Sequence, residues 1–109
     1  LSSTPAVATE QLARVRLARV YVAKAAYTEA QAQIAQEPSK AFASEYAEVR
    51  GDILKAQGNK EAAATAYKKA LETTDPQNQE RSMVLQMKAD ELKSADAALA
   101  VPAVVEKAQ

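Results

Sequence analysis

Apolar and polar residues recur along this chain with the spacing of helices. Helix-forming residues dominate from Glu10 to Leu99, and no stretch alternates with the period of two that a strand requires. The sequence therefore predicts an all-α fold. Four residue pairs carry signals that end one helix or begin the next. They are Thr4-Pro5, Pro38-Ser39, Gly58-Asn59 and Asp75-Pro76. The segments between them have the length of helical hairpins.

The chain also matches itself after a shift of 33 positions. Small residues then fall on small ones, and large apolar residues fall on large apolar ones. The matching pairs are Ala18 with Gly51, Val20 with Ile53, Tyr21 with Leu54, Ala25 with Gly58, Ala30 with Ala63 and Ile34 with Tyr67. This pattern is typical of stacked hairpins, because small positions let the two helices of a hairpin touch and large ones fill the space to the next hairpin.

The second unit resembles a tetratricopeptide repeat. The residues that carry the resemblance are Gly51, Leu54, Gly58, Ala63, Tyr67, Ala70 and Pro76. In the first unit, Ala25 stands where a turn glycine is usual. We expect tetratricopeptide-type antiparallel hairpins; the alternative is a simple bundle of three to five helices.

The predicted domain covers residues 12–93. It contains repeats at about residues 11–43 and 44–76 and a capping helix over 78–93, which offers Val84, Leu85, Met87 and Leu92 for packing. Such a helix is expected because the end of a stack exposes an apolar face that a more polar helix must cover. Residues 1–11 are a lead-in or the start of the first helix, and residues 94–109 form an alanine-rich tail.

A second resemblance lies in short blocks between Leu12 and Leu92. The blocks are Arg16-Leu17-Ala18-Arg19-Val20, Val49-Arg50-Gly51-Asp52 with Ile53-Leu54 and Gln57-Gly58, Ala66-Tyr67 with Ala70-Leu71, and Leu85-Gln86-Met87-Lys88 with Asp90 and Leu92. They resemble the C-terminal periplasmic domain of the YfgM-like family, the ancillary subunits of the SecYEG translocon. The resemblance implies an envelope scaffold or chaperone-like adaptor on the periplasmic side of the inner membrane, with translocon subunits, periplasmic chaperones or client chains as partners. A generic cytoplasmic tetratricopeptide adaptor is the alternative.

Composition narrows the chemistry that the chain can perform. Fourteen basic residues balance fourteen acidic ones, which disfavours binding to nucleic acid. The absence of histidine and cysteine removes nucleophile–histidine pairs and the usual transition-metal ligands, so we expect no enzyme, no cofactor and no metal site. No apolar run is long enough to cross a membrane. The chain begins at Leu1, which suggests a processed fragment and leaves an upstream anchor open.

The candidate binding site is therefore a surface. In tetratricopeptide stacks the first helix of each hairpin lines a concave groove, and the repeat maps seven residues to it. They are Val15, Arg19 and Val22 from the first unit and Glu45, Glu48, Asp52 and Lys55 from the second. A groove with these acids favours an extended or helical segment with basic and apolar residues. Two alternatives remain: the carboxylates form a solvated face and Arg19 simply pairs with Asp52, or the exposed end of the stack pairs with itself in a homodimer.

Overall fold

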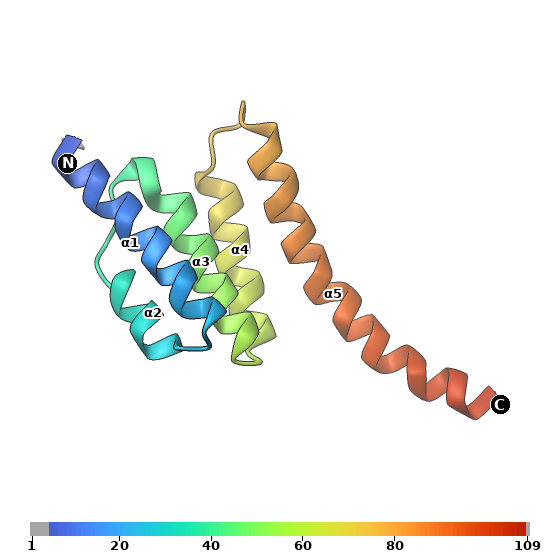
Figure 1. The fold of residues 1–109 in the computed structure, drawn as a ribbon. Coiled ribbons are helices and arrows are strands. Elements are labelled where there is room, and N and C mark those ends of the chain that lie inside the picture. The colour runs from blue at the N-terminus through green and yellow to red at the C-terminus, as the bar shows by residue number, and fades with distance from the viewer. Residues whose placement is uncertain (1–4, 109) are drawn as a thin grey trace.

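The computed structural model describes the backbone of residues 5–108 and the side chains of residues 6–93. Within this part the chain forms α1 (Pro5–Ala23), α2 (Tyr27–Gln33), the 3-10 helix η1 (Lys40–Phe42), α3 (Ala43–Ala56), α4 (Lys60–Thr73) and α5 (Gln79–Ala108). No strand occurs among the described residues, and the all-α fold is confirmed. The helices α1 and α2 form one hairpin and α3 and α4 a second, while α5 packs on the second hairpin and then leads away from it (Figure 1).

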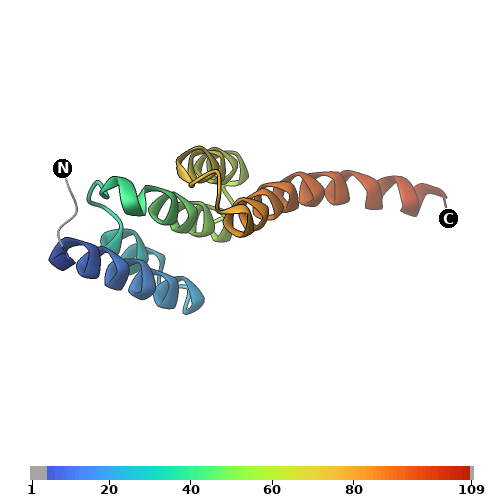
Figure 2. The ribbon, with the colours of Figure 1, turned by 90° about the horizontal axis from the view of Figure 1, so that it is seen from above.

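Seen from above, α1, α3 and α5 follow one another, with α4 on one side of α3 and α5 (Figure 2).

The helix α1 already begins at Pro5, so residues 5–11 belong to it, whereas the expected cap at Thr4 lies outside the described residues. The helix α5 continues beyond Lys93 to Ala108. The division into a lead-in, a domain over 12–93 and a tail stays a prediction.

The turns of the two hairpins have the same backbone geometry. After α3, Gly58 has φ +85°, its N–H donates to the carbonyl of Lys55, and the N–H of Asn59 donates to Leu54. This is the Schellman arrangement, in which a residue with positive φ lets the last carbonyls of a helix be satisfied. The side chain of Asn59 then caps α4 by accepting from the N–H of Ala62. Both residues therefore act as the sequence predicted.

After α1, the same arrangement is built on an alanine. The N–H of Ala25 donates to Val22 and the N–H of Ala26 donates to Tyr21, and Ala25 takes φ +60°. These bonds match those of the second turn after the 33-residue shift. Ala25 is therefore a residue with a Cβ in the left-handed region that glycine occupies in the second hairpin.

The helices of each hairpin meet at small residues. Gly51 of α3 lies against the ring of Tyr67 in α4, and a Cβ at Gly51 would come within 2.6 Å of that ring. Tyr67, Ala63 and Leu92 form one apolar cluster, and Ala47, Ala70 and Leu85 form another. The packing role predicted for Gly51 is confirmed.

A third apolar cluster joins the first hairpin to α3. It consists of Val15, Ala18, Ala30, Ile34, Tyr46, Val49 and Ile53. Tyr46 and Tyr67 are buried, and Tyr21 and Tyr27 pack against this third cluster.

Residues that match in the internal repeat are not always equally buried. Ile53 is buried against the first hairpin, whereas Val20, its counterpart in α1, is exposed, because α1 has no earlier hairpin against it in the described part of the chain. In α5, Leu85 and Leu92 pack as expected. Val84 and Met87 do not, since both side chains point away from the second hairpin and are exposed.

Candidate protein-binding face

The helix α3 lies between the first hairpin, α4 and α5, so half of its residues are buried. Glu48 is among them, with only 6% of its side chain exposed. A buried carboxylate is costly unless other charges and donors compensate for its lost hydration. The polar contacts around Glu48 therefore decide whether this part of the fold is stable.

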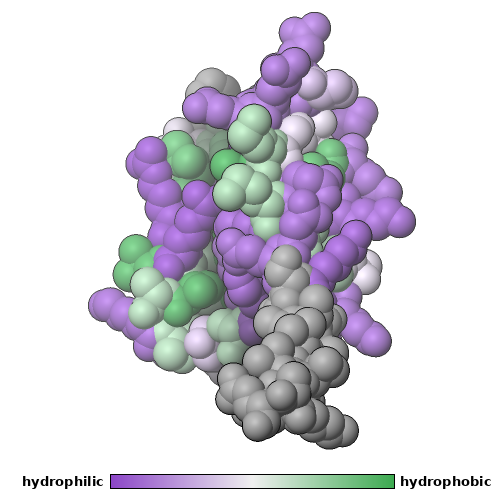
Figure 3. All heavy atoms as spheres, turned by 90° about the vertical axis from the view of Figure 1, so that its right-hand side faces the viewer, coloured by the Kyte–Doolittle hydropathy of each residue, from purple (hydrophilic) through white to green (hydrophobic). Residues whose placement is uncertain are grey.

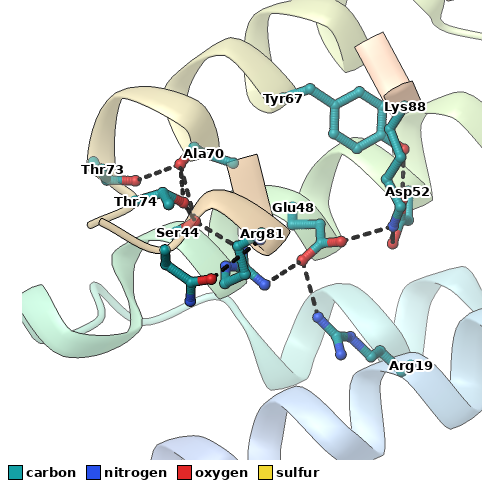
Figure 4. A network of polar contacts seen from close by, with 11 residues as sticks. Arg19, Ser44, Glu48, Asp52, Tyr67, Ala70, Thr73, Thr74, Arg81 and Lys88 are labelled. Atoms are coloured by element: carbon teal, nitrogen blue, oxygen red, sulfur yellow. Dashed lines mark hydrogen bonds and ion pairs between the residues drawn. The ribbon is translucent and has the colours of Figure 1, made fainter. Parts of the chain in front are cut away.

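Cations from two different helices compensate for the burial of Glu48 (Figure 4). Arg19 of α1 binds its Oε1 atom at 3.1 Å, and Arg81 of α5 binds the same oxygen at 3.1 Å. Lys88 of α5 binds the other oxygen, Oε2, at 2.8 Å. One carboxylate of α3 thus joins the helices that precede and follow it in the stack.

The electrostatic balance at Glu48 favours the charged form. Burial alone would raise the pKa of Glu48, but the hydrogen bond from Lys88 and the charges of Lys88, Arg19 and Arg81 outweigh it, so the pKa is lowered. The pKa of Lys88 responds in the opposite sense. Burial would lower it, and its contacts with Glu48 and Asp52 raise it above the ordinary value. Both groups are therefore ionised around neutral pH.

Asp52 lies one turn after Glu48 and extends the network towards α4. Lys88 binds both of its carboxylate oxygens at 3.1 Å, and the hydroxyl of Tyr67 donates to it. Burial, together with the hydrogen bond to Asp52, strongly raises the pKa of the Tyr67 hydroxyl, which remains protonated as a donor. This hydroxyl therefore makes its hydrogen bond inside the fold.

The other end of the network reaches the end of α4. Arg81 donates from its second terminal nitrogen to the hydroxyl of Ser44 at 2.8 Å, and the hydroxyls of Ser44 and Thr74 are also hydrogen-bonded. Both hydroxyls lie within 2.9 Å of the carbonyl of Ala70. Since this carbonyl belongs to the last turn of α4, the network also satisfies an end of that helix.

The structure brings four of the seven predicted groove residues together. Arg19, Glu48 and Asp52 belong to the network, and Lys55 lies one turn further along α3, where it binds Glu91 of α5 at 2.7 Å. The exposed parts of Arg19, Asp52 and Lys55, together with those of Lys88 and Glu91 from α5, form a surface that follows α1, α3 and α5, and we call this surface the shared face.

The other three predicted residues have different environments. Val15 is buried in the apolar cluster between the first hairpin and α3, and Val22 packs against the same cluster. Glu45 lies in the first turn of α3 and lines a surface hollow with Ser44, Thr74 and Arg81. Val15 therefore presents no surface to a ligand in this structure.

Two expectations about the acids of the groove are wrong. Glu48 does not belong to a solvated face, because it is buried, and Arg19 pairs with Glu48 instead of Asp52. The acids of the groove also no longer favour a ligand with basic residues. Arg19, Arg81 and Lys88 supply three positive charges to the two carboxylates of Glu48 and Asp52, so these acids are already neutralised.

Sequence reasoning missed the residues that α5 contributes. Arg81, Lys88 and Glu91 lie in the segment predicted to cap the stack, which packs on the second hairpin where the first helix of a third layer would lie. A signal was available. After a shift of 36 positions, Leu85 falls on Val49 and Lys88 falls on Asp52. The shift of 33 positions that aligns the first two hairpins hides this match.

The described residues form neither a metal site nor a membrane span. No three His, Cys, Asp or Glu side chains come together there to hold a metal ion. In the same part of the chain, no helix has both the length and the apolar character needed to cross a membrane.

The fold and its shared face define a stack of helical hairpins whose first helices present side chains along one surface. Comparison with known families agrees with this class, since the model of the tetratricopeptide repeat-like domain matches residues 1–94. The chain belongs to this family, whose members are typically non-catalytic protein-interaction modules. No curated protein and no solved structure matches the chain.

Proposed function

We propose that this domain binds a polypeptide segment along the shared face and performs no catalysis. The observation that carries the proposal is the polar network, which fixes charged side chains of α1, α3 and α5 on one surface (Figure 4). A surface held in place before binding loses little side-chain entropy when a partner docks. The exposed tips of Arg19 and Lys55 supply polar contacts at two places on it.

Within this class, we propose an envelope scaffold or chaperone-like adaptor on the periplasmic side of the inner membrane. Its partners are subunits of the Sec translocon, periplasmic chaperones or their client chains. The support is the resemblance of the short blocks between Leu12 and Leu92 to the YfgM-like family. A cytoplasmic tetratricopeptide adaptor is the second candidate. Its support is the stack of hairpins alone, since this candidate does not depend on the resemblance of the blocks.

Site-specific crosslinking in cells tests both levels of the proposal. A photo-crosslinking amino acid replaces Lys55, which lies on the shared face, and in a matched strain replaces Lys68, an exposed residue of α4. We expect crosslinks from position 55 and none from position 68, with a translocon subunit or a periplasmic chaperone as the product. Equal crosslinking from both positions, or none from either, contradicts binding along the shared face. Products that are all cytoplasmic proteins support the second candidate instead.

A self-associating module is the remaining alternative. It predicts crosslinks between two copies of the chain and a mass that rises with concentration in light scattering. A mass that stays that of the monomer at every concentration contradicts it.

A further inference from the structure

The large hydrophobic side chains that remain exposed in the described part of the chain lie on two helices only. On α1 they are Leu12, Leu17 and Val20, and on α5 they are Met83, Val84 and Met87. Met83 and Met87 are the most exposed of the six, at 64% and 58%, and Val84 is 46% exposed. Their spacing places them on one side of the helix. We call this side the outer face of α5.

The stacking of the helices explains why this face is open. Leu85 and Ala89 of α5 pack on the second hairpin, as Val49 and Ile53 of α3 pack on the first. In sequence, each α5 residue of these two pairs lies 36 positions after its α3 counterpart. The helix α5 therefore holds the position of a first helix in a third hairpin.

The same shift shows what the outer face corresponds to in the second hairpin. It places Met83 on Ala47 and Met87 on Gly51. In α3 these two residues contact α4, since Ala47 packs with Ala70 and Gly51 lies against the ring of Tyr67. Met83 and Met87 thus occupy the positions against which the second helix of a hairpin packs.

No second helix covers these positions in the described part of the chain. The helix α5 continues to Ala108 and leads away from the hairpins instead of turning back (Figure 1). Figure 3 shows the side of the molecule on which α5 lies, where hydrophobic side chains (green) lie between hydrophilic ones (purple). The third layer therefore has a first helix with an uncovered apolar face.

The chemistry of the outer face indicates what would cover it. Methionine side chains are flexible and polarisable, so they adapt to differently shaped apolar partners. The exposed charged residues beside the stripe are Glu80, Asp90 and Glu91, whereas Arg81 and Lys88, which lie three and four residues from Val84, are partly buried and bind Glu48 and Asp52. Glu91 also binds Lys55, while Lys93 lies farther round the helix. The rim of the face is acidic.

We propose that the outer face of α5 docks an amphipathic helix of a partner protein, with apolar residues on one side and lysine or arginine beside them. This helix takes the place against α5 that α4 takes against α3. A helix laid on an apolar groove with matching charges at its edges is an established mode of peptide recognition. A second α5 fits less well, because pairing two copies of this face brings their acidic rims together. The proposal rests on the domain being a protein-interaction module.

The test uses residues 1–109 and a labelled 18-residue peptide with leucine at helical spacing and lysine elsewhere. A second peptide carries glutamate in place of lysine. Fluorescence anisotropy measures both affinities in the unchanged protein and in the double variant Met83→Ser, Met87→Ser. The matched control is Leu17→Ser, Val20→Ser, which removes exposed apolar side chains from α1 instead. Circular dichroism verifies that each variant is folded.

We expect the lysine peptide to bind, the glutamate peptide to bind at least about tenfold more weakly, and the α5 variant to lose at least about tenfold in affinity. The α1 control should stay within about twofold of the unchanged protein. Equal loss in both variants, or equal binding of both peptides, overturns the proposal. So does a mass that grows with concentration and returns to the monomer in the α5 variant, because a second copy is then the occupant.

The two proposals can fail separately. Crosslinking from Lys55 reports on the shared face, and the peptide experiment reports on the outer face of α5. If the unchanged protein binds neither peptide but still crosslinks from position 55, only the docking helix is contradicted. If it binds the lysine peptide but does not crosslink from position 55, only binding along the shared face is contradicted.

Discussion

Replacing Glu48 by glutamine tests whether the polar network stabilises the stack. Glutamine has nearly the same shape, so the change removes the charge and leaves the packing. Removing one partner of a buried ion pair costs about 3–5 kcal/mol. Here the side chains of Arg19, Arg81 and Lys88 are 48%, 25% and 29% exposed, so they regain water and the cost is lower. We expect a loss of about 2 kcal/mol in the free energy of unfolding.

Urea and thermal unfolding, followed by circular dichroism, measure this loss. For a domain of this size, 2 kcal/mol corresponds to a fall in Tm of about 10 °C. The control is Glu72→Gln, the same chemical change at an exposed position of α4, which should alter stability by less than about 0.5 kcal/mol.

The pH dependence separates charge from packing. The folded protein lowers the pKa of Glu48 below its ordinary value of 4.5, so the stability that it contributes is present above that value and is lost as the pH falls through the folded pKa. The difference between the unchanged protein and Glu48→Gln should therefore shrink below about pH 4.5. Equal stability of the two proteins at pH 7, or a difference that stays constant on acidification, refutes the reasoning.

Three further substitutions have defined outcomes in the same unfolding assay. Gly51→Ala should cost about 1–2 kcal/mol, because the new Cβ meets the ring of Tyr67 and the gain in helix propensity offsets only part of the clash; unchanged stability contradicts this. Ala25→Gly should stabilise the protein by about 0.5–1 kcal/mol, because glycine removes the strain of the left-handed backbone at this position and this gain exceeds the entropy that glycine adds to the unfolded chain; a lower Tm contradicts strain at this position. Tyr67→Phe should cost about 1 kcal/mol through the lost bond to Asp52, and no change would show that Lys88 alone satisfies Asp52.

The fold could be predicted from the sequence because its signals are local. The turn at Gly58 and Asn59, the small residue at Gly51 and the buried Ile34 and Tyr67 are all predicted by residue types that recur at a fixed spacing. Each of these residues acts within its own hairpin or at the junction to the next one. A repeat found by self-comparison captures such positions well.

The candidate site was only partly predictable because its contacts are long-range. The sequence indicated Arg19, Glu48 and Asp52 as neighbours, but whether Glu48 is buried depends on Arg81 and Lys88, which lie more than 30 residues away. The spacing between α3 and α5 differs by three residues from that between α1 and α3, so the repeat did not align these cations with the groove. Isolated charges also have no periodic signal that separates a buried network from a solvated face.

The position of Glu48 has a consequence for how the stack unfolds. Repeat proteins are commonly described by the stability of each unit plus interactions between nearest neighbours. In such a description α1 and α5 are independent once the second hairpin is folded. Here Arg19 of α1 and Arg81 of α5 bind the same oxygen atom of Glu48, each at 3.1 Å. The carboxylate therefore couples two helices that are not neighbours, and fraying at one end of this short array is felt at the other.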